Sequence, residues 1–285
     1  MTHVTHPLKR ALSLTALLAL GGTAVAAHDM WIEPSGYRPV IGRTVGFRLR
    51  VGQDFQGDPL PRDPNLIQQF IAVDGTTTTQ VVGRDGADPA GLMRVAARGL
   101  LVVGYHSRPS PVVLPATKFN TYLTEEGLEA IAALRAKKGE TNAEARETFV
   151  RCAKSLLLAG PPYAAQQDRV LGLPLEFVAD RNPYMVTAGQ GLGVRLLYRD
   201  QPLAGALVVA LNQRDPMARI AARSDKAGHV TLKLTEAGPW LIKAVHMIPA
   251  PAGSDSQWAS YWASLTFELA DATPQAIPSS SPGAR

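Results

Sequence analysis

The sequence has little cysteine and, beyond its start, no long apolar run, and each shortage excludes a class of protein. Cys152 is the only cysteine among 285 residues. A single cysteine cannot form an internal disulfide, which excludes a disulfide-stapled scaffold and predicts a buried, small apolar residue. After residue 27 no segment approaches the roughly 20 apolar residues of a membrane-spanning helix, so we expect no transmembrane anchor.

The sequence also lacks a strong excess of charge of either sign. The formal net charge is +5. Its lysines and arginines are scattered, and no basic stripe is interleaved with aromatic residues. Nucleic acid is therefore excluded as an expected partner.

The first 27 residues have the pattern of a secretory signal peptide. Lys9 and Arg10 form a basic segment, an apolar segment follows over residues 11–20, and small residues end at Ala27. This pattern predicts cleavage between Ala27 and His28 and a periplasmic or secreted mature protein. Removal of two basic residues lowers the net charge from +5 to +3 (5 − 2 = 3).

The rest of the chain predicts a mainly β protein with two β-sandwich-like regions, of immunoglobulin or transthyretin type, joined by a helical hairpin. We expect a signal peptide over 1–27, an N-terminal β domain over 28–117, the hairpin over 118–165, a C-terminal sandwich over 166–269 and a disordered tail over 270–285. Alternating apolar residues or short apolar runs indicate strands. These lie at residues 45–51, 100–105, 193–198, 207–211, 230–234, 240–246 and 262–269, whereas three prolines predict a loop over 57–65.

The helical hairpin is predicted from capping patterns. Thr124 precedes two glutamates and an apolar face that runs to Gly139, which indicates a first helix. Thr141 and Glu144 fit a capping box, and apolar residues at helical spacing follow up to Gly160, which indicates a second helix. A capping or solvent-exposed role explains Glu125, Glu126, Glu144 and Glu147 in this arrangement.

Cleavage after Ala27 gives His28 an unusual chemistry. The free α-amine has a pKa of about 7.7–8.0 and loses its proton more readily than a lysine does. Together with the ring Nδ1 it can chelate a metal ion, and one or two further imidazoles or carboxylates would complete a site for nickel, cobalt, copper or zinc.

Few residues remain to complete such a site. The other histidines after residue 27 are His106, His229 and His246; His246 ends one face of a predicted strand, His106 lies at a strand end, and His229 follows a turn. Asp29 and Glu33 are near His28 and offer carboxylates. The metal ligands we predict are His28, His246, His106 and Asp29. We expect no catalytic residues, because the sequence contains no nucleophile triad, phosphate-binding loop or zinc-protease motif.

The mature start, residues 28–34 (HDMWIEP), resembles the His-Asp-Phe-Trp-type opening of a family of exported bacterial proteins, with Met30 in place of Phe. Members of that family are described as domains of unknown function or as the periplasmic component of nickel/cobalt uptake systems. Residues 118–128, 151–154, 244–247 and 262–267 resemble further family segments in the expected order. The resemblance covers nearly all of residues 28–269.

The resemblance implies an extracytoplasmic protein that binds a divalent transition metal and presents it to a membrane transporter, with His28 and His246 as its best candidate ligands. Residues 202–206, 224–228 and 238–242 also resemble a transthyretin-like or carboxypeptidase-regulatory β-sandwich, a fold that serves many functions.

Three functions are compatible with these observations. The first is a periplasmic metal-binding protein that supports nickel or cobalt uptake. The second is a copper protein with a histidine brace, either a carrier or an oxidase. The third is a β-sandwich interaction module in which His28 is incidental.

Overall fold

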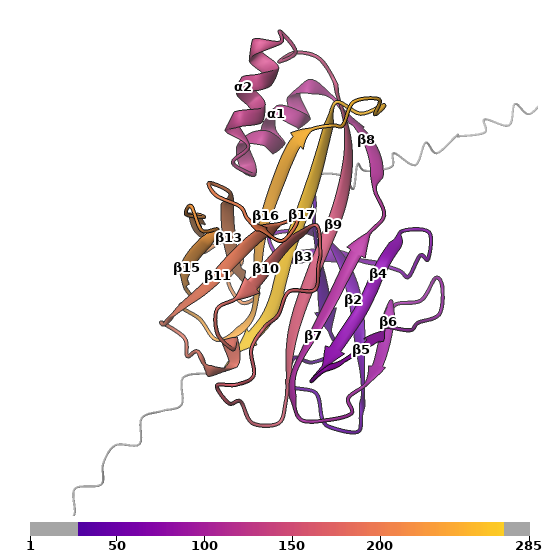
Figure 1. The fold of residues 1–285 in the computed structure, drawn as a ribbon, viewed down its shortest axis with the longest axis vertical. Coiled ribbons are helices and arrows are strands. Elements are labelled where there is room, and N and C mark those ends of the chain that lie inside the picture. The colour runs from indigo at the N-terminus through magenta and orange to yellow at the C-terminus, as the bar shows by residue number, and fades with distance from the viewer. Residues whose placement is uncertain (1–27, 271–285) are drawn as a thin grey trace, which may run out of the picture.

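The computed structural model describes residues 28–270, and it confirms a mainly β protein with only two α-helices in that range (Figure 1). The predicted signal peptide and all but the first residue of the predicted tail lie outside the described residues. The strands are β1 (Asp29–Pro34), β2 (Thr44–Gln53), β3 (Gln56–Leu60), β4 (Ile67–Asp74), β5 (Thr77–Gln80), β6 (Gly91–Arg94), β7 (Gly99–Ser107), β8 (Ser110–Leu114), β9 (Ala145–Ala159), β10 (Leu175–Ala179), β11 (Gly191–Tyr198), β12 (Gln201–Pro202), β13 (Leu207–Asn212), β14 (Ile220–Arg223), β15 (His229–Lys233), β16 (Gly238–Pro249) and β17 (Trp258–Leu269). The helices are α1 (Ala116–Glu125) and α2 (Glu129–Lys137), and a 3₁₀ turn covers Pro183–Met185.

These strands form three sheets. The largest has nine strands in the order β14-β13-β16-β17-β9-β7-β4-β5, with β8 paired to one end of β9. A four-stranded sheet of β1, β2, β3 and β6 covers part of one face of this sheet, and a four-stranded sheet of β10, β11, β12 and β15 covers part of the other. Both predicted β regions therefore contribute strands to one continuous sheet.

Strand β9 lies where the two sandwiches meet. Its side chains alternate, so that Cys152 and Leu156 pack in the core beneath the β10–β11 sheet, whereas Ala153 and Leu157 pack in the core beneath the β1–β2 sheet. β9 pairs with β7 in antiparallel fashion and with β17 in parallel fashion. The chain reaches this central position through the helices and the long turn that precede it (Figure 1).

The two helices cover one end of the long strands β16 and β17 (Figure 1). Phe119, Leu123 and Ile131 pack with Trp258 and Trp262 in a separate apolar cluster. α1 begins after Pro115, and Gly127 with φ of 64° separates it from α2. A positive φ is readily adopted by glycine, so the chain reverses here without strain.

The second predicted helix is wrong, because residues 145–159 form β9. The helical spacing of Phe149, Cys152, Ala153 and Leu156 arises within a strand that is covered on both faces. This strand is buried at every position from Val150 onward, but Arg151, Lys154 and Ser155 interrupt its apolar residues, which therefore fall at helix-like as well as strand-like spacing.

The first predicted helix is displaced. Thr124 does not cap a helix but lies inside α1, where its hydroxyl donates a hydrogen bond to the carbonyl oxygen of Asn120 at 3.1 Å. The predicted face is also incomplete, since Ile131 is buried and Leu134 is exposed. Helical structure in the predicted hairpin region is thus confined to α1 and α2.

The predicted strands are confirmed as β2, β7, β11, β13, β15, β16 and β17. The predicted loop over 57–65 is wrong at its start, because β3 pairs with β2 and includes Pro59. β3 pairs with no other named strand, and a proline is tolerated at such an edge because its missing N–H faces away from the pairing.

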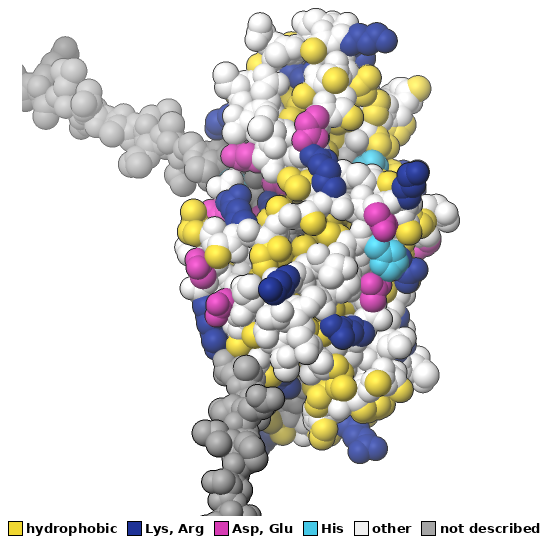
Figure 2. All heavy atoms as spheres, turned by 90° about the vertical axis from the view of Figure 1, so that its left-hand side faces the viewer, with side chains coloured by type: hydrophobic (Ala, Val, Ile, Leu, Met, Phe, Trp, Pro, Cys, Tyr) yellow, Lys and Arg dark blue, Asp and Glu magenta, His cyan; other side chains and the backbone are white. Residues whose placement is uncertain are grey.

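Two further expectations concern Cys152 and the surface. Cys152 is buried, as predicted, and burial raises the pKa of its thiol to about 12. Acidic and basic side chains are interspersed over the face shown in Figure 2. Within residues 28–270, neither helix has the length and apolar character needed to cross a bilayer.

Candidate metal site

The candidate site is built around Lys243, a charged residue in the middle of β16. Its neighbours Ile242 and Ala244 face the core beneath the β10–β11 sheet, so the Lys243 side chain points to the opposite face. There its Nζ donates to Asp29 Oδ1 at 2.9 Å and to Glu126 Oε1 at 2.8 Å. One ammonium thus joins the start of β1, the end of α1 and the centre of β16.

Burial and charge oppose each other at these three groups. Burial raises the pKa of Asp29 and of Glu126, and Lys243 offsets part of this shift. Burial also acts to lower the pKa of Lys243, but the two carboxylates outweigh it and raise the pKa above its ordinary value. Lys243 is therefore held as an ammonium, while each carboxyl group takes up a proton more readily than an exposed one would.

A polar hollow of about 210 Å³ opens beside these groups. Asp54 and Arg219, which form an ion pair, line it together with Gln53 and Glu125. Four carboxyl groups and two cationic side chains therefore face one small space, which gives an excess of negative charge when all six are ionised.

His28 lies at the rim of this region. It lines two further hollows, of about 640 and 380 Å³. Gln53 lines all three hollows, and Glu125 lines both the 210 Å³ and the 380 Å³ hollows, so the spaces adjoin. His28 thus shares a hollow with Glu125, whereas Asp29, which the sequence predicted as a ligand, lines the adjoining 210 Å³ hollow and is paired with Lys243.

The other two predicted ligands lie elsewhere. His246 on β16 is opposite Tyr261 on β17, and His106 on β7 is opposite Cys152 on β9, so both face the β10–β11 side of the large sheet. Asp29 reaches Lys243 on the other side. His246 and His106 are also three strands apart in the sheet, about 14 Å at the usual strand spacing. The structure therefore does not bring them together with each other or with His28.

His246 and His106 have different surroundings on that side of the sheet. The His246 ring lies edge-on to Tyr198, with ring centroids 4.5 Å apart. His106 lines a hollow of about 480 Å³ together with Tyr261 and Arg199. Burial lowers the pKa of both imidazoles, which favours their neutral form.

The remaining candidates have protein partners. Arg50 donates to the Glu33 carboxylate at 2.7 Å, and His229 Nδ1 lies 3.2 Å from Asp180. Within residues 28–270 no three or more His, Cys, Asp or Glu side chains are already arranged as a metal cage. A metal at His28 would thus draw on its own nitrogens and on rearranged neighbours.

Sequence reasoning missed several residues of this site. It interpreted Glu126 as a capping or solvent-exposed residue, whereas Glu126 is buried and paired with Lys243. Lys243, Asp54 and Arg219 were not singled out. A signal for Lys243 was present, because a charged residue interrupts an otherwise apolar strand over residues 240–245, and such a residue is seldom buried without a partner.

Comparison with known proteins identifies the family. A model of the family described as Domain of unknown function (DUF4198) matches residues 25–248. The chain belongs to this family. The match contains β1, α1 and nearly all of β16, and therefore both carboxyl groups that pair with Lys243. No curated protein matches the sequence.

Solved structures add little. The chain is similar to the D0-D1 domain of Intimin, with 14% identity, a TM-score of 0.18, and coverage of 84% of this chain and 97% of that one. It is also similar to dimeric latent PorU from Porphyromonas gingivalis, with 10% identity, a TM-score of 0.23, and coverage of 86% and 20%. TM-scores this low support no inference about fold or function.

Proposed function

We propose that this DUF4198 protein is exported, that it binds a divalent transition metal through His28 and the adjoining carboxylates, and that it supports nickel or cobalt uptake by a membrane transporter. The proposal includes cleavage after Ala27, a periplasmic or secreted location and a transthyretin-like C-terminal sandwich. The observation that supports it best is the position of His28 beside Glu125 and the acidic hollow.

The chemistry of the donors fits such an ion. A mature N-terminal His28 supplies an amine and an imidazole, and Glu125 is an exposed carboxylate on a shared wall. Imidazole suits nickel, copper and zinc, and carboxylates add charge neutralisation. Asp29 and Glu126 would contribute negative charge near the ion without contacting it directly, because both are paired with Lys243.

Titration of the mature protein with nickel, cobalt, copper and zinc tests the proposal. We expect at least one metal to bind more tightly than about 10 μM, which corresponds to roughly −7 kcal/mol. His28→Ala should weaken binding by more than the roughly 10- to 100-fold that loss of an outer partner costs. His246→Ala is the matched control and should leave the affinity unchanged, since that ring faces the other side of the sheet.

A second comparison isolates the α-amine. The uncleaved precursor has the same His28 imidazole but no free amine at that residue. We expect it to bind the metal more weakly than the mature protein. Equal affinities would show that the amine is not a ligand, and no binding tighter than about 10 μM in either form would overturn the proposal.

The copper histidine brace has less support from the geometry. It needs a second imidazole next to His28, and His246 and His106 lie on the opposite face. Oxygen- or peroxide-dependent product formation by copper-loaded protein would favour it over a carrier of nickel or cobalt.

A further inference from the structure

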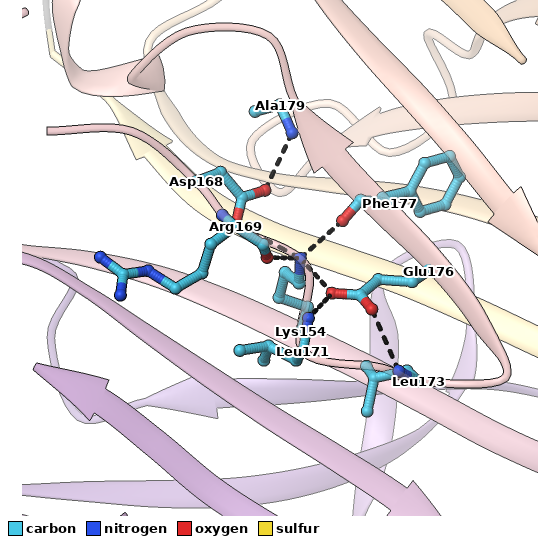
Figure 3. A network of polar contacts seen from close by, with 8 residues as sticks. All are labelled: Lys154, Asp168, Arg169, Leu171, Leu173, Glu176, Phe177 and Ala179. Carbon is cyan, nitrogen blue, oxygen red and sulfur yellow. Dashed lines mark hydrogen bonds and ion pairs between the residues drawn. The ribbon is translucent and has the colours of Figure 1, made fainter. Parts of the chain in front are cut away.

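A second lysine, Lys154 on β9, lies in a closed polar cluster on the other face of the large sheet (Figure 3). Its side chain is 1% exposed, and those of Asp168 and Glu176 are 0% and 1% exposed. Lys154 Nζ lies 3.3 Å from Asp168 Oδ1 and 2.5 Å from Glu176 Oε1. An amine and two carboxyl groups are thus held together away from water.

The Asp168 carboxyl group is fixed by backbone donors. The N–H of Arg169 donates to Oδ1 at 2.7 Å, and the N–H of Ala179 donates to Oδ2 at 2.8 Å. Backbone donors aimed at the oxygens of an acyl group stabilise the negative charge that develops when a nucleophile adds to its carbon. The same donors fix the orientation of the Asp168 carboxyl group relative to Lys154 Nζ.

Lys154 and Glu176 are held equally firmly. The carbonyl oxygens of Arg169 and Phe177 each accept a hydrogen bond from Nζ at 2.8 Å. Glu176 accepts hydrogen bonds from the N–H groups of Leu171 and Leu173 at 2.8 and 3.0 Å. Glu176 Oε1 is within hydrogen-bond distance of Nζ, which is the position required of a group that takes a proton from the amine and returns it.

We propose that Lys154 and Asp168 join in an intramolecular amide bond, formed by the folded protein itself with Glu176 as proton carrier. Glu176 takes a proton from the Nζ ammonium, and Nζ then adds to Cγ of Asp168. One Asp168 oxygen leaves as water with two of the three Nζ protons, and the third proton stays on the amide nitrogen. The positive and negative charges cancel, nothing is oxidised or reduced, and no co-reactant is needed.

The surroundings favour the amide over the ion pair. Taking two opposite charges out of water is costly even when they attract each other, whereas a buried amide carries no net charge. The bond would tie the segment between β9 and β10 to the central strand of the large sheet. The single cysteine of the chain cannot form an internal disulfide, so the amide would supply a covalent cross-link that a disulfide cannot.

Tryptic mapping of the denatured full chain tests the bond directly. Trypsin cuts after Arg151, Lys154 and Arg169 when their side chains carry no covalent link, which gives separate peptides 152–154 and 155–169. An amide on Lys154 blocks the cut, so we expect one peptide, 152–169, that is one water lighter than its sequence. Lys243 is the internal control and should be cut normally, because its carboxyl partners border an open hollow.

Each outcome decides the proposal. An uncut 152–169 peptide that lacks one water supports it, and its fragment ions should place the link between Lys154 and Asp168. Separate peptides 152–154 and 155–169 would overturn it. A link from Lys154 to peptide 170–181, which contains Glu176, would overturn the assignment of Asp168 as the acyl group.

Variants separate the roles of the three groups. Lys154→Met and Asp168→Ala should abolish the loss of water. Glu176→Gln keeps both reacting groups and should slow bond formation, so that freshly purified protein contains a larger unlinked fraction than wild type. An unchanged linked fraction in Glu176→Gln would remove Glu176 from the mechanism, and the wild-type map remains decisive where a variant does not fold.

Discussion

Two lysines of this protein each lie between two carboxyl groups, but on opposite faces of the same nine-stranded sheet and with different access to solvent. Lys154 and its partners are enclosed by backbone donors and acceptors (Figure 3). Lys243 is 14% exposed, and its partners Asp29 and Glu126 are 6% and 10% exposed, beside a hollow of about 210 Å³. A lysine, an aspartate and a glutamate therefore form an enclosed cluster around Lys154, whereas the same three residue types around Lys243 border an open hollow.

The comparison shows that accessibility, rather than residue type, separates a structural cluster from a candidate binding site. Every carboxylate oxygen of Asp168 and Glu176 accepts a backbone hydrogen bond. Around Lys243, by contrast, Glu125 and Asp54 extend the acidic surface towards solvent and towards His28. An incoming cation could displace the Lys243 ammonium but has no path to the side chain of Lys154.

The largest effect is expected for Lys154→Met. Removal of the lysine leaves two buried carboxyl groups with neither an amide bond nor a cation, and buried carboxyl groups left uncompensated in this way cost about 3–5 kcal/mol. Chemical denaturation should show this loss in the free energy of unfolding at pH 7. A loss below about 1 kcal/mol would contradict the description of this cluster as closed.

Glu147 adds a third case to the comparison, a buried carboxyl group that is paired with hydroxyl groups and not with a lysine. It accepts a hydrogen bond from the Tyr122 hydroxyl at 3.2 Å and another from Ser260, and burial raises its pKa to about 7. Between about pH 4.5 and pH 7 the unfolded chain loses this proton while the folded chain keeps it. Stability should therefore fall as the pH rises through this window, by on the order of 3 kcal/mol.

Glu147→Gln tests this contribution. The amide cannot ionise, so the variant should lose the fall in stability between about pH 4.5 and pH 7 that is due to this residue. Denaturation curves at several pH values measure it. An unchanged pH profile in the variant would show that Glu147 is already ionised in the folded protein.

Lys243→Met should have a smaller effect on stability, about 1–3 kcal/mol, because solvent and a cation can reach the carboxyl groups that remain. It should also strengthen the binding of a divalent cation, since Asp29 and Glu126 lose their internal competitor. Denaturation with and without nickel or cobalt measures both effects. Weaker metal binding in Lys243→Met would contradict the placement of these carboxylates at the site.

The smallest effect is expected for the exposed pair of Arg223 and Glu129, which are 45% and 68% exposed. Exposed ion pairs contribute about 0.2–1 kcal/mol, and salt screens them. A double-mutant cycle with Arg223→Ala and Glu129→Ala should give a coupling energy in this range. A larger coupling energy would mean that the exposed fraction of an ion pair does not predict its contribution to the stability of this protein.

Much of the fold could be predicted from local patterns, and the largest failure is β9. Strands with one covered face, such as β2, alternate clearly and were recognised. β9 is covered on both faces and includes the buried charged residues Arg151 and Lys154, so its apolar residues do not alternate regularly and were interpreted as a helix. Only the tertiary arrangement, in which two sandwiches share one sheet, explains its sequence.

The candidate site was predictable only where neighbours in sequence are neighbours in space. His28 and Asp29 are adjacent in the chain and share one region. Lys243 is 214 residues from Asp29, and their contact depends on how β1 packs over the nine-stranded sheet. His246 was expected at the same site because the family resemblance and the small number of histidines favoured it. The alternation that places it on one face of a strand with Ile242 and Ala244 does not say which side of the sheet that face covers.

The most direct test of the metal-binding proposal is native mass spectrometry of the exported protein purified without chelators, because one spectrum reports the N-terminus and the bound ion together. We predict a chain that begins at His28 and carries one nickel or cobalt ion, and a His28→Ala variant without that ion. A chain that begins elsewhere, or one that begins at His28 and remains metal-free when nickel and cobalt are supplied, would contradict it.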